Sequence, residues 1–294
     1  MGTPRRLVVS VENLAPGQPD RELVIKGPPA ERAFDAHGQP TKAAEGFARG
    51  KGVSVGDLQV REVDGGRYVV AVVYETGRSA GDVLAEALPG LIAGIKFDKN
   101  MRWNASNVGF SRPIRWLLAL LGESVVPFQY AGYPSGRQTR GLRFRTPETF
   151  EAANPEDYFG KMAAQGILLD PGERRRVILE QVRRILVETG ASDRVDDGLL
   201  DEVTNLVECP TALRGEFERE QLHLPQEVLI SVMKKHQRYF PAYTNSGKLM
   251  PHFVAVRNGD ARHLGVVADG NEQVIRARCA DATFFISEDL KHKL

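Results

Sequence analysis

Cysteine is scarce in this chain, and long apolar runs are absent. The two cysteines, Cys209 and Cys279, lie far apart and form no Cys-x-x-Cys pair. This spacing argues against a disulfide framework or a zinc site and favours a reducing cytoplasm. The longest apolar run, Trp116 to Leu121, falls far short of the roughly 20 residues that span a bilayer. The sequence therefore predicts no membrane span.

Catalytic motifs are also missing. We find no GxxxxGK[ST] phosphate loop, no HExxH pair, no GxSxG elbow and no EF-hand spacing. The histidines are scattered without a pair at ligand spacing, and no two carboxylates stand apart as an acid and a base. The prediction is that the chain holds no catalytic residues, metal ligands or cofactor. On residues alone, an RNA-binding or scaffolding domain is favoured over an enzyme.

The organisation is that of an α+β protein with mixed or antiparallel sheets and packed helices. A length of 294 residues predicts two or three domains, and a net charge of +1 means that any polyanion binding must come from local clusters. Five segments are expected. Residues 1–96 would form an N-terminal α+β domain truncated at its start, and residues 97–150 a basic strand-rich segment that continues its sheet. A helical segment is expected over 151–215, a helix-plus-hairpin segment over 216–270, and the start of a long helix cut by the chain end over 271–294.

Individual elements follow from capping and turn residues. The turn residues Asp64-Gly-Gly66 predict a hairpin, and Thr41 is a candidate N-cap. Pro171–Glu188 has one apolar face, and its triplet Arg174–Arg176 is expected on the solvated face. Further helices are expected from Pro155, over 197–207 and over 225–235, and strands over 7–11, 22–26, 112–121, 124–130, 239–243 and 252–257. Trp103 and Trp116 are expected in the core, and both cysteines are expected to be buried filler.

The segment Met233–Phe240 gathers cationic and aromatic side chains. Such a segment can contact phosphates and also stack on bases, so its candidate nucleic-acid-binding residues are Lys234, Lys235, His236, Arg238 and Tyr239. A plainer interpretation is that the lysines favour the C-terminal end of a helix dipole and that Tyr239 begins an ordinary strand. The residue pattern leaves both interpretations open.

A second basic cluster is larger. Between Lys99 and Arg145 there are eight Lys and Arg residues and a single acid, Glu123. Nucleic-acid contact is favoured for the end of this stretch over a merely solvated loop. The candidates there are Arg137, Arg140, Arg143 and Arg145.

Several stretches resemble one family, the beta subunit of bacterial heterotetrameric glycyl-tRNA synthetase. The most specific are Met233-Lys-Lys-His-Gln-Arg-Tyr-Phe-Pro241, His252-Phe-Val-Ala-Val-Arg-Asn-Gly-Asp260 and Gly270-Asn-Glu-Gln-Val-Ile-Arg-Ala-Arg278. Others are Lys26-Gly-Pro-Pro29, Thr41-Lys-Ala-Ala-Glu-Gly-Phe-Ala48, Met101-Arg-Trp103, Arg112-Pro-Ile-Arg-Trp116 and Thr139-Arg-Gly141. Departures are Leu142 where the family has His, Asn104 for Gly, Cys209 for Trp and Cys279 for Leu. Against this family the chain resembles a fragment without the opening segment and without the HD-like and anticodon-binding regions.

The resemblance implies a division of labour within a glycine–tRNA ligase. The alpha subunit would use ATP and Mg²⁺ to attach glycine to tRNA(Gly), and this chain would support tRNA binding and α2β2 assembly in the cytoplasm. Its N-terminal half would resemble the editing-type domain of the phenylalanyl-tRNA synthetase beta subunit. The alternatives are a scaffold without direct tRNA contact and, less favoured, an editing-type hydrolase domain.

Overall fold

A computed structural model of the chain describes residues 1–143, 145 and 148–291. The chain divides into two compact units. Unit 1 combines Met1–Ser10, Gly122–Ser124 and Arg137–Leu294, and unit 2 combines Val11–Leu121 and Val125–Gly136. Both contain helices and antiparallel strands, so the predicted α+β class is confirmed.

The centre of unit 1 is a three-stranded antiparallel sheet in the order β13-β15-β14. Strand β15 (Leu249–Asn258) lies in the middle, between β13 (Pro210–Glu216) and β14 (Phe240–Tyr243). Pro210 lies opposite Asn258, so β13 pairs along its whole length with β15. The two strands predicted over 239–243 and 252–257 are confirmed as β14 and β15.

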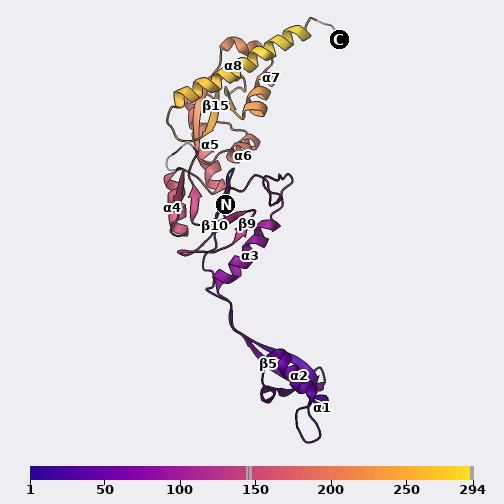
Figure 1. Ribbon diagram of the computed structural model, residues 1–294. Helices are drawn as coiled ribbons and strands as arrows, with labels where there is room; N and C mark the ends of the chain where they lie inside the picture. Colours follow the sequence, from indigo (N-terminus) through magenta and orange to yellow (C-terminus); the bar gives the residue numbers. More distant parts are fainter. Residues whose placement is uncertain (144, 146–147, 292–294) are drawn as a thin grey trace. The chain divides into compact units, whose positions relative to one another are not determined.

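Helices cover both faces of this sheet (Figure 1). Alternate residues of a strand point to opposite faces, and β15 follows this rule. Val254 packs into a core with α5 (Pro171–Glu188) and α6 (Asp197–Thr204). Phe253 packs on the other side into a core with α7 (Gln226–Ser231) and α8 (Leu264–Asp289). Unit 1 is therefore built as helix, sheet and helix layers.

Helix caps explain why α4 and α5 begin where the sequence predicts. The Asp170 carboxylate accepts a hydrogen bond from the Glu173 backbone N–H at 2.7 Å, and Pro171 takes the first helical position. Asn154 caps α4 (Pro155–Ala164) in the same way, at 2.8 Å from the Asp157 N–H. A side-chain oxygen at the N-cap satisfies a backbone donor that has no partner within the helix.

Small elements complete unit 1. Strands β1 (Gly2–Thr3) and β2 (Arg6–Leu7) form an N-terminal hairpin, and β11 (Gln138–Arg140) pairs with β12 (Thr149–Glu151). The 3₁₀ turn η2 (Arg219–His223) precedes α7.

Unit 2 contains a second antiparallel sheet, in the order β3-β5-β4. Its strands are β3 (Arg21–Pro29), β4 (Gln59–Val63) and β5 (Gly66–Glu75), with helices α1 (Ala30–Ala33) and α2 (Lys42–Lys51) and the 3₁₀ turn η1 (Val55–Asp57) between them. The predicted hairpin is confirmed, with Asp64 and Gly65 at φ 53° and 77° as a tight hairpin turn requires. Thr41 caps α2 as expected. Ala33, Ala44 and Val69 form the buried core.

The remainder of unit 2 corrects several predictions. Helix α3 (Ala80–Gly94) is present, but the long strands predicted over 112–121 and 124–130 are replaced by two-residue strands. Pro127 lies inside the second range and cannot donate to a ladder, which explains its interruption. Trp103 and Trp116, expected in the core, are half-buried. The short strands of unit 2 are β6 (Leu117–Leu118), β7 (Leu120–Leu121), β9 (Gln129–Tyr130) and β10 (Tyr133–Gly136). The first residue of β8 (Ser124–Val125) belongs to unit 1 and the second to unit 2.

Two further predictions in unit 1 are wrong. The strand expected over 7–11 is limited to Arg6–Leu7, and β13 forms where no strand is predicted. Strand β13 begins with a proline and lacks clear alternation, so its identity depends on pairing with β15 rather than on its own residues. Within the described ranges, no helix is long and apolar enough to cross a membrane.

Candidate nucleic-acid interface

The Met233–Phe240 segment forms an irregular turn rather than the end of a regular helix. Helix α7 runs into a π-helix, η3 (Val232–Gln237), which contains three cationic or imidazole side chains. Arg238 closes it in the left-handed conformation at φ 58°. The backbone N–H of Tyr239 returns to the Met233 carbonyl at 2.9 Å. A π-turn and a non-glycine residue at positive φ are both uncommon, and both occur often at functional sites.

Helix α6 and its cap hold two of the cationic side chains of this turn. Lys234 Nζ forms an ion pair with Asp196, and Arg238 Nε lies 2.6 Å from Glu202 Oε2. Asp196 also caps α6, accepting from the Leu199 N–H at 2.7 Å. The hydrogen bond from Lys234 lowers the pKa of the Asp196 carboxyl. Lys234 and Arg238 are thus fixed by carboxylates on a neighbouring element.

The other two cationic or imidazole side chains of the turn are exposed. Lys235 and His236 face solvent, and the Lys235 carbonyl accepts a hydrogen bond from the Arg238 guanidinium. Tyr239 lies on the opposite side, where its ring stacks on Phe253 at 4.8 Å between centroids and an interplanar angle of 8°. Only 8% of Tyr239 is exposed, so its ring belongs to the core. The structure therefore divides the five candidates into exposed, ion-paired and buried groups.

The Arg137–Arg145 stretch is divided in a similar way. Arg137 donates to the Glu123 carbonyl at 3.0 Å, and Arg145 donates to the Gln165 carbonyl at 3.1 Å. Arg140 and Arg143 are exposed. Residue 144 of this stretch lies outside the described residues.

A buried ion cluster holds this basic stretch in place, and no sequence pattern indicates it. The fully buried Glu208 carboxylate accepts from Arg5 at 3.1 Å, from Arg6 and from the Thr3 hydroxyl at 2.9 Å. Arg6 also donates to the Arg140 carbonyl at 2.6 Å. Burial lowers the pKa of the Arg5 guanidinium, while the Glu208 charge opposes that effect. The N-terminal hairpin thus binds both Glu208 and the backbone that presents Arg140.

Arg174 corrects the expectation that the α5 arginine triplet is solvated. Only 1% of Arg174 is exposed, and its guanidinium donates to the carbonyls of Thr204 at 2.8 Å and Leu168 at 2.6 Å. Burial lowers its pKa. The remaining two arginines form surface ion pairs, Arg175 with Asp197 and Arg176 with Glu180. The signal that could have identified Arg174 is its helical spacing of four from Ile178 on the buried face.

Both cysteines are buried, as the sequence predicts. Burial raises the pKa of the Cys209 thiol, and it raises the pKa of the Cys279 thiol to about 11. A thiol is nucleophilic as the thiolate, so neither side chain is activated at neutral pH. Within the part of the chain that the structure describes, no group of three or more His, Cys, Asp or Glu is placed to hold a metal ion.

Fold and site define an α+β protein with a cationic π-turn and a second basic stretch on one of its two units. Comparison with known proteins is specific. The model of the glycyl-tRNA synthetase beta subunit family matches residues 1–294. The chain belongs to this family.

Similar curated proteins carry the same description. The glycine–tRNA ligase beta subunit of Desulforamulus reducens is 50% identical over 293 residues, covering 100% of this chain and 42% of that protein. Those of Syntrophotalea carbinolica and Moorella thermoacetica are 46% and 47% identical, covering 99% and 98% of this chain. The chain spans about 42% of the length of each of these relatives.

Proposed function

We propose that this chain is a non-catalytic, tRNA-binding part of a glycine–tRNA ligase beta subunit. It supports the ATP-dependent attachment of glycine to tRNA(Gly), with ATP and Mg²⁺ used by the alpha subunit in a cytoplasmic α2β2 enzyme. Family membership supports the setting, since the matched model describes the glycyl-tRNA synthetase beta subunit. The likeness of the N-terminal half to the editing-type domain of phenylalanyl-tRNA synthetase stays a prediction.

The observation that carries the RNA-binding role is the exposure of Lys235 and His236 on a strained turn. Ion pairs to α6 and its cap fix the residues on either side of them, Lys234 and Arg238. The backbone that presents Lys235 and His236 is therefore held in place before any ligand arrives, which lowers the entropy cost of binding. Arg143, with Arg140 near it, supplies a second exposed cationic stretch in the same unit. Tyr239 is excluded from the RNA contact because its ring is in the core.

The test removes exposed charges without freeing a buried or paired carboxylate. Lys235→Gln/Arg143→Gln should weaken tRNA(Gly) binding and lower the slope of log K against log salt by about 2, roughly 1 for each phosphate that is no longer neutralised. Filter binding at KCl concentrations from roughly 50 to 200 mM, where salt dependence is steep, measures both quantities.

The matched control is Arg183→Gln/Arg219→Gln, two exposed arginines of unit 1 that form no ion pair within the described part of the chain. It removes the same charge from the same unit and should leave the salt slope unchanged. Equal slopes for the wild type and the Lys235/Arg143 variant would exclude these residues as phosphate contacts.

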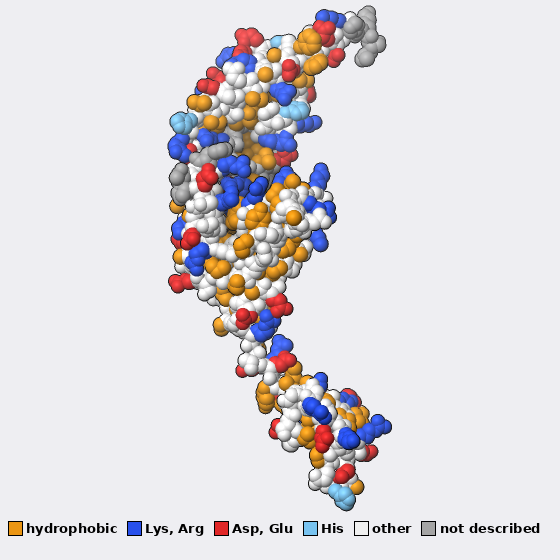
Figure 2. Space-filling model, viewed as in Figure 1, with side chains coloured by type: hydrophobic (Ala, Val, Ile, Leu, Met, Phe, Trp, Pro, Cys, Tyr) orange, Lys and Arg blue, Asp and Glu red, His pale blue; other side chains and the backbone are white. Residues whose placement is uncertain are grey.

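A second function, subunit assembly, is favoured by the apolar surface of α8. Phe284 and Phe285 are 59% and 63% exposed, and hydrophobic side chains lie at the surface near the C-terminal end of that helix (Figure 2). Exposed apolar surface of this kind marks contact sites for other chains. Co-purification with the alpha subunit in the absence of tRNA affinity would favour this function over RNA binding.

A further inference from the structure

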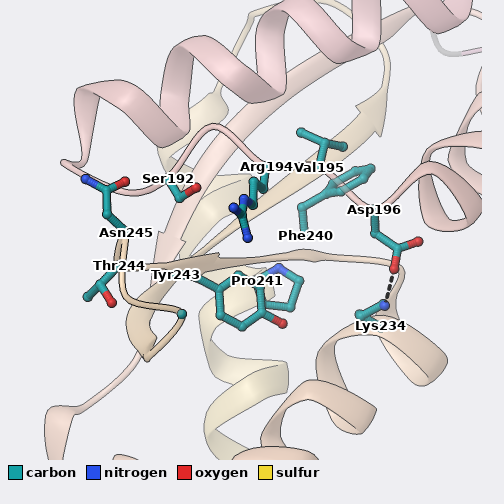
Figure 3. Close-up of a pocket in the computed structure, with 11 residues that line it drawn as sticks. Ser192, Arg194, Val195, Asp196, Lys234, Phe240, Pro241, Tyr243, Thr244 and Asn245 are labelled. Carbon is teal, nitrogen blue, oxygen red and sulfur yellow. Dashed lines mark hydrogen bonds and ion pairs between the residues drawn. The ribbon is translucent and has the colours of Figure 1, made fainter.

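A pocket of about 290 Å³ opens beside the π-turn, within unit 1. Its walls come from the connection between α5 and α6, from β14 and from the turn after β14 (Figure 3). Lys234 lines it on one side, so the pocket is continuous with the cationic turn. This volume lies at the lower end of the range for ligand pockets. The pocket is large enough for one small chemical group but not for a nucleic-acid duplex.

Arg194 supplies the charge of the pocket. It extends from the α5–α6 connection into the space beside β14 (Figure 3). Among the described residues, its guanidinium has neither an ion-pair nor a hydrogen-bond partner. The one acid in the lining, Asp196, is already bound to Lys234. An anion entering the pocket would therefore meet an available planar donor, the geometry that suits a phosphate group.

The part of the lining that comes from β14 is partly apolar. Tyr243 and Pro241 line the pocket from one side of the strand, and the Phe240 ring lies on the other side, in the core with α5 and α6 (Figure 3). Tyr243 is half-buried against the core on the α8 side of the sheet, which fixes the position of its ring. Burial, and secondarily the charge of Asp196, raises the pKa of its hydroxyl, so the ring stays neutral. A fixed, neutral aromatic face is a surface on which a base can stack.

Short polar side chains form the rim. The lining includes Ser192 and Asn245, which can donate to and accept from a ribose or the edge of a base. The hydroxyl of Thr244, also in the lining, instead accepts from the Lys248 N–H at 3.1 Å and lies 2.9 Å from the Ser246 hydroxyl. The Ser192 backbone is tied to β14 by a hydrogen bond from its N–H to the Tyr243 carbonyl at 2.7 Å. This hydrogen bond holds the rim at Ser192 beside the aromatic side chain of Tyr243.

We propose that this pocket takes a single unstacked nucleotide of an RNA strand, with its phosphate at Arg194 and its base against Tyr243. This inference rests on the proposed RNA-binding function and names the form of RNA recognised at this point. Unstacked nucleotides occur in loops and single-stranded ends, whose bases are open to aromatic side chains.

Cross-linking locates the nucleotide directly. A tRNA(Gly) transcript containing 4-thiouridine is irradiated with the chain, and the cross-linked peptides are mapped after trypsin digestion. A cross-link within residues 239–248, the tryptic peptide that contains Tyr243, is the expected result. Cross-links confined to peptides with Lys235 or Arg143 would overturn the pocket while leaving the proposed function intact. Absence of tRNA binding would overturn both.

Substitutions give the second measurement. Arg194→Ala should weaken tRNA binding about tenfold, as the removal of one charged hydrogen-bonded contact does. The control Arg183→Ala removes another exposed arginine of unit 1 and should leave affinity within about twofold. Tyr243→Phe keeps the aromatic face and should bind as wild type, whereas Tyr243→Leu should bind about tenfold more weakly. Thermal melting of each variant checks the fold, and equal affinities of folded Arg194→Ala and wild type would refute the proposal.

Discussion

At the scale of single residues, the most consequential side chain is one that no sequence motif contains. Glu208 is 0% exposed, and its carboxylate joins the N-terminal hairpin to the body of unit 1 through Arg5 and Arg6. These partners are distant in sequence, with a separation of 202 positions for Arg6. No local pattern encodes such a contact. The sequence could predict cationic side chains but not which of them are neutralised by distant acids.

Removing the Glu208 charge should therefore be costly. Glu208→Ala leaves two arginines beside a vacated buried site, and breaking a buried pair in this way costs about 3–5 kcal/mol. The free energy of unfolding, measured by urea denaturation, should fall by an amount in that range. Glu180→Ala, which breaks an exposed pair with Arg176 on α5, should cost less than about 1 kcal/mol. Similar decreases for the two variants would contradict the assigned role of Glu208.

Cys279 gives unit 1 a dependence on alkaline pH. Burial, with a smaller effect of Glu218, raises the thiol pKa from 9.0 to about 11. Between these values the folded chain keeps a proton that the unfolded chain releases, so this contribution to stability is full below pH 9 and falls as pH rises towards 11. The free energy of unfolding should drop between roughly pH 8 and pH 10.5 by less in Cys279→Ala than in wild type. An identical drop in both proteins would rule out this linkage.

At the scale of elements, predictability follows how local the signal is. Helices α4 and α5 begin with a capping side chain and a proline, and the hairpin at Asp64-Gly65 has its turn residues in sequence. These elements can be predicted from their own residues. Strand β13 and the π-turn η3 depend on tertiary contacts, with β15 and with the cap of α6 respectively. The candidate site is accordingly located by composition, while its division into exposed, paired and buried residues requires the fold.

The β13–β15 pair depends on a glycine that faces a phenyl ring. Gly215 lies opposite Phe253, and a Cβ at this position would lie 2.2 Å from the ring. Phe253 is fully buried and cannot move aside. Gly215→Ala should therefore lower the free energy of unfolding by about 1–3 kcal/mol. Gly160→Ala in α4, with no heavy atom within 4 Å of the added carbon, should instead raise it by about 0.5–1 kcal/mol. A Gly215 variant as stable as wild type would show that the strands separate to admit the methyl group.

At the scale of the whole chain, the small net charge means that an RNA partner and a protein partner would contact different parts of the surface. A net charge of +1 gives no general attraction to polyanions. The proposed RNA contact would then depend on local exposed cations, those of the π-turn, of the Arg140–Arg143 stretch and of the pocket at Arg194, and the proposed protein contact on apolar surface elsewhere. Helix α8 offers such a surface, since Phe284 and Phe285 are exposed while Ile275 and Cys279 on the same helix are buried. The two proposed functions would be separable by mutation because they would use different residues.

Substitution of the exposed phenylalanines of α8 tests the proposed protein contact while the candidate RNA-binding cations stay in place. Phe284→Ser/Phe285→Ser should leave tRNA affinity unchanged. It should weaken co-purification with a glycyl-tRNA synthetase alpha subunit at least about tenfold, because each apolar carbon that is no longer buried at a contact costs about 0.8 kcal/mol. The amount of co-expressed alpha subunit recovered by pull-down measures this co-purification. Val187→Ser on α5, where the valine is 61% exposed, removes apolar surface elsewhere and should have no effect. Undiminished pull-down by the double variant would place the alpha-subunit contact away from the end of α8.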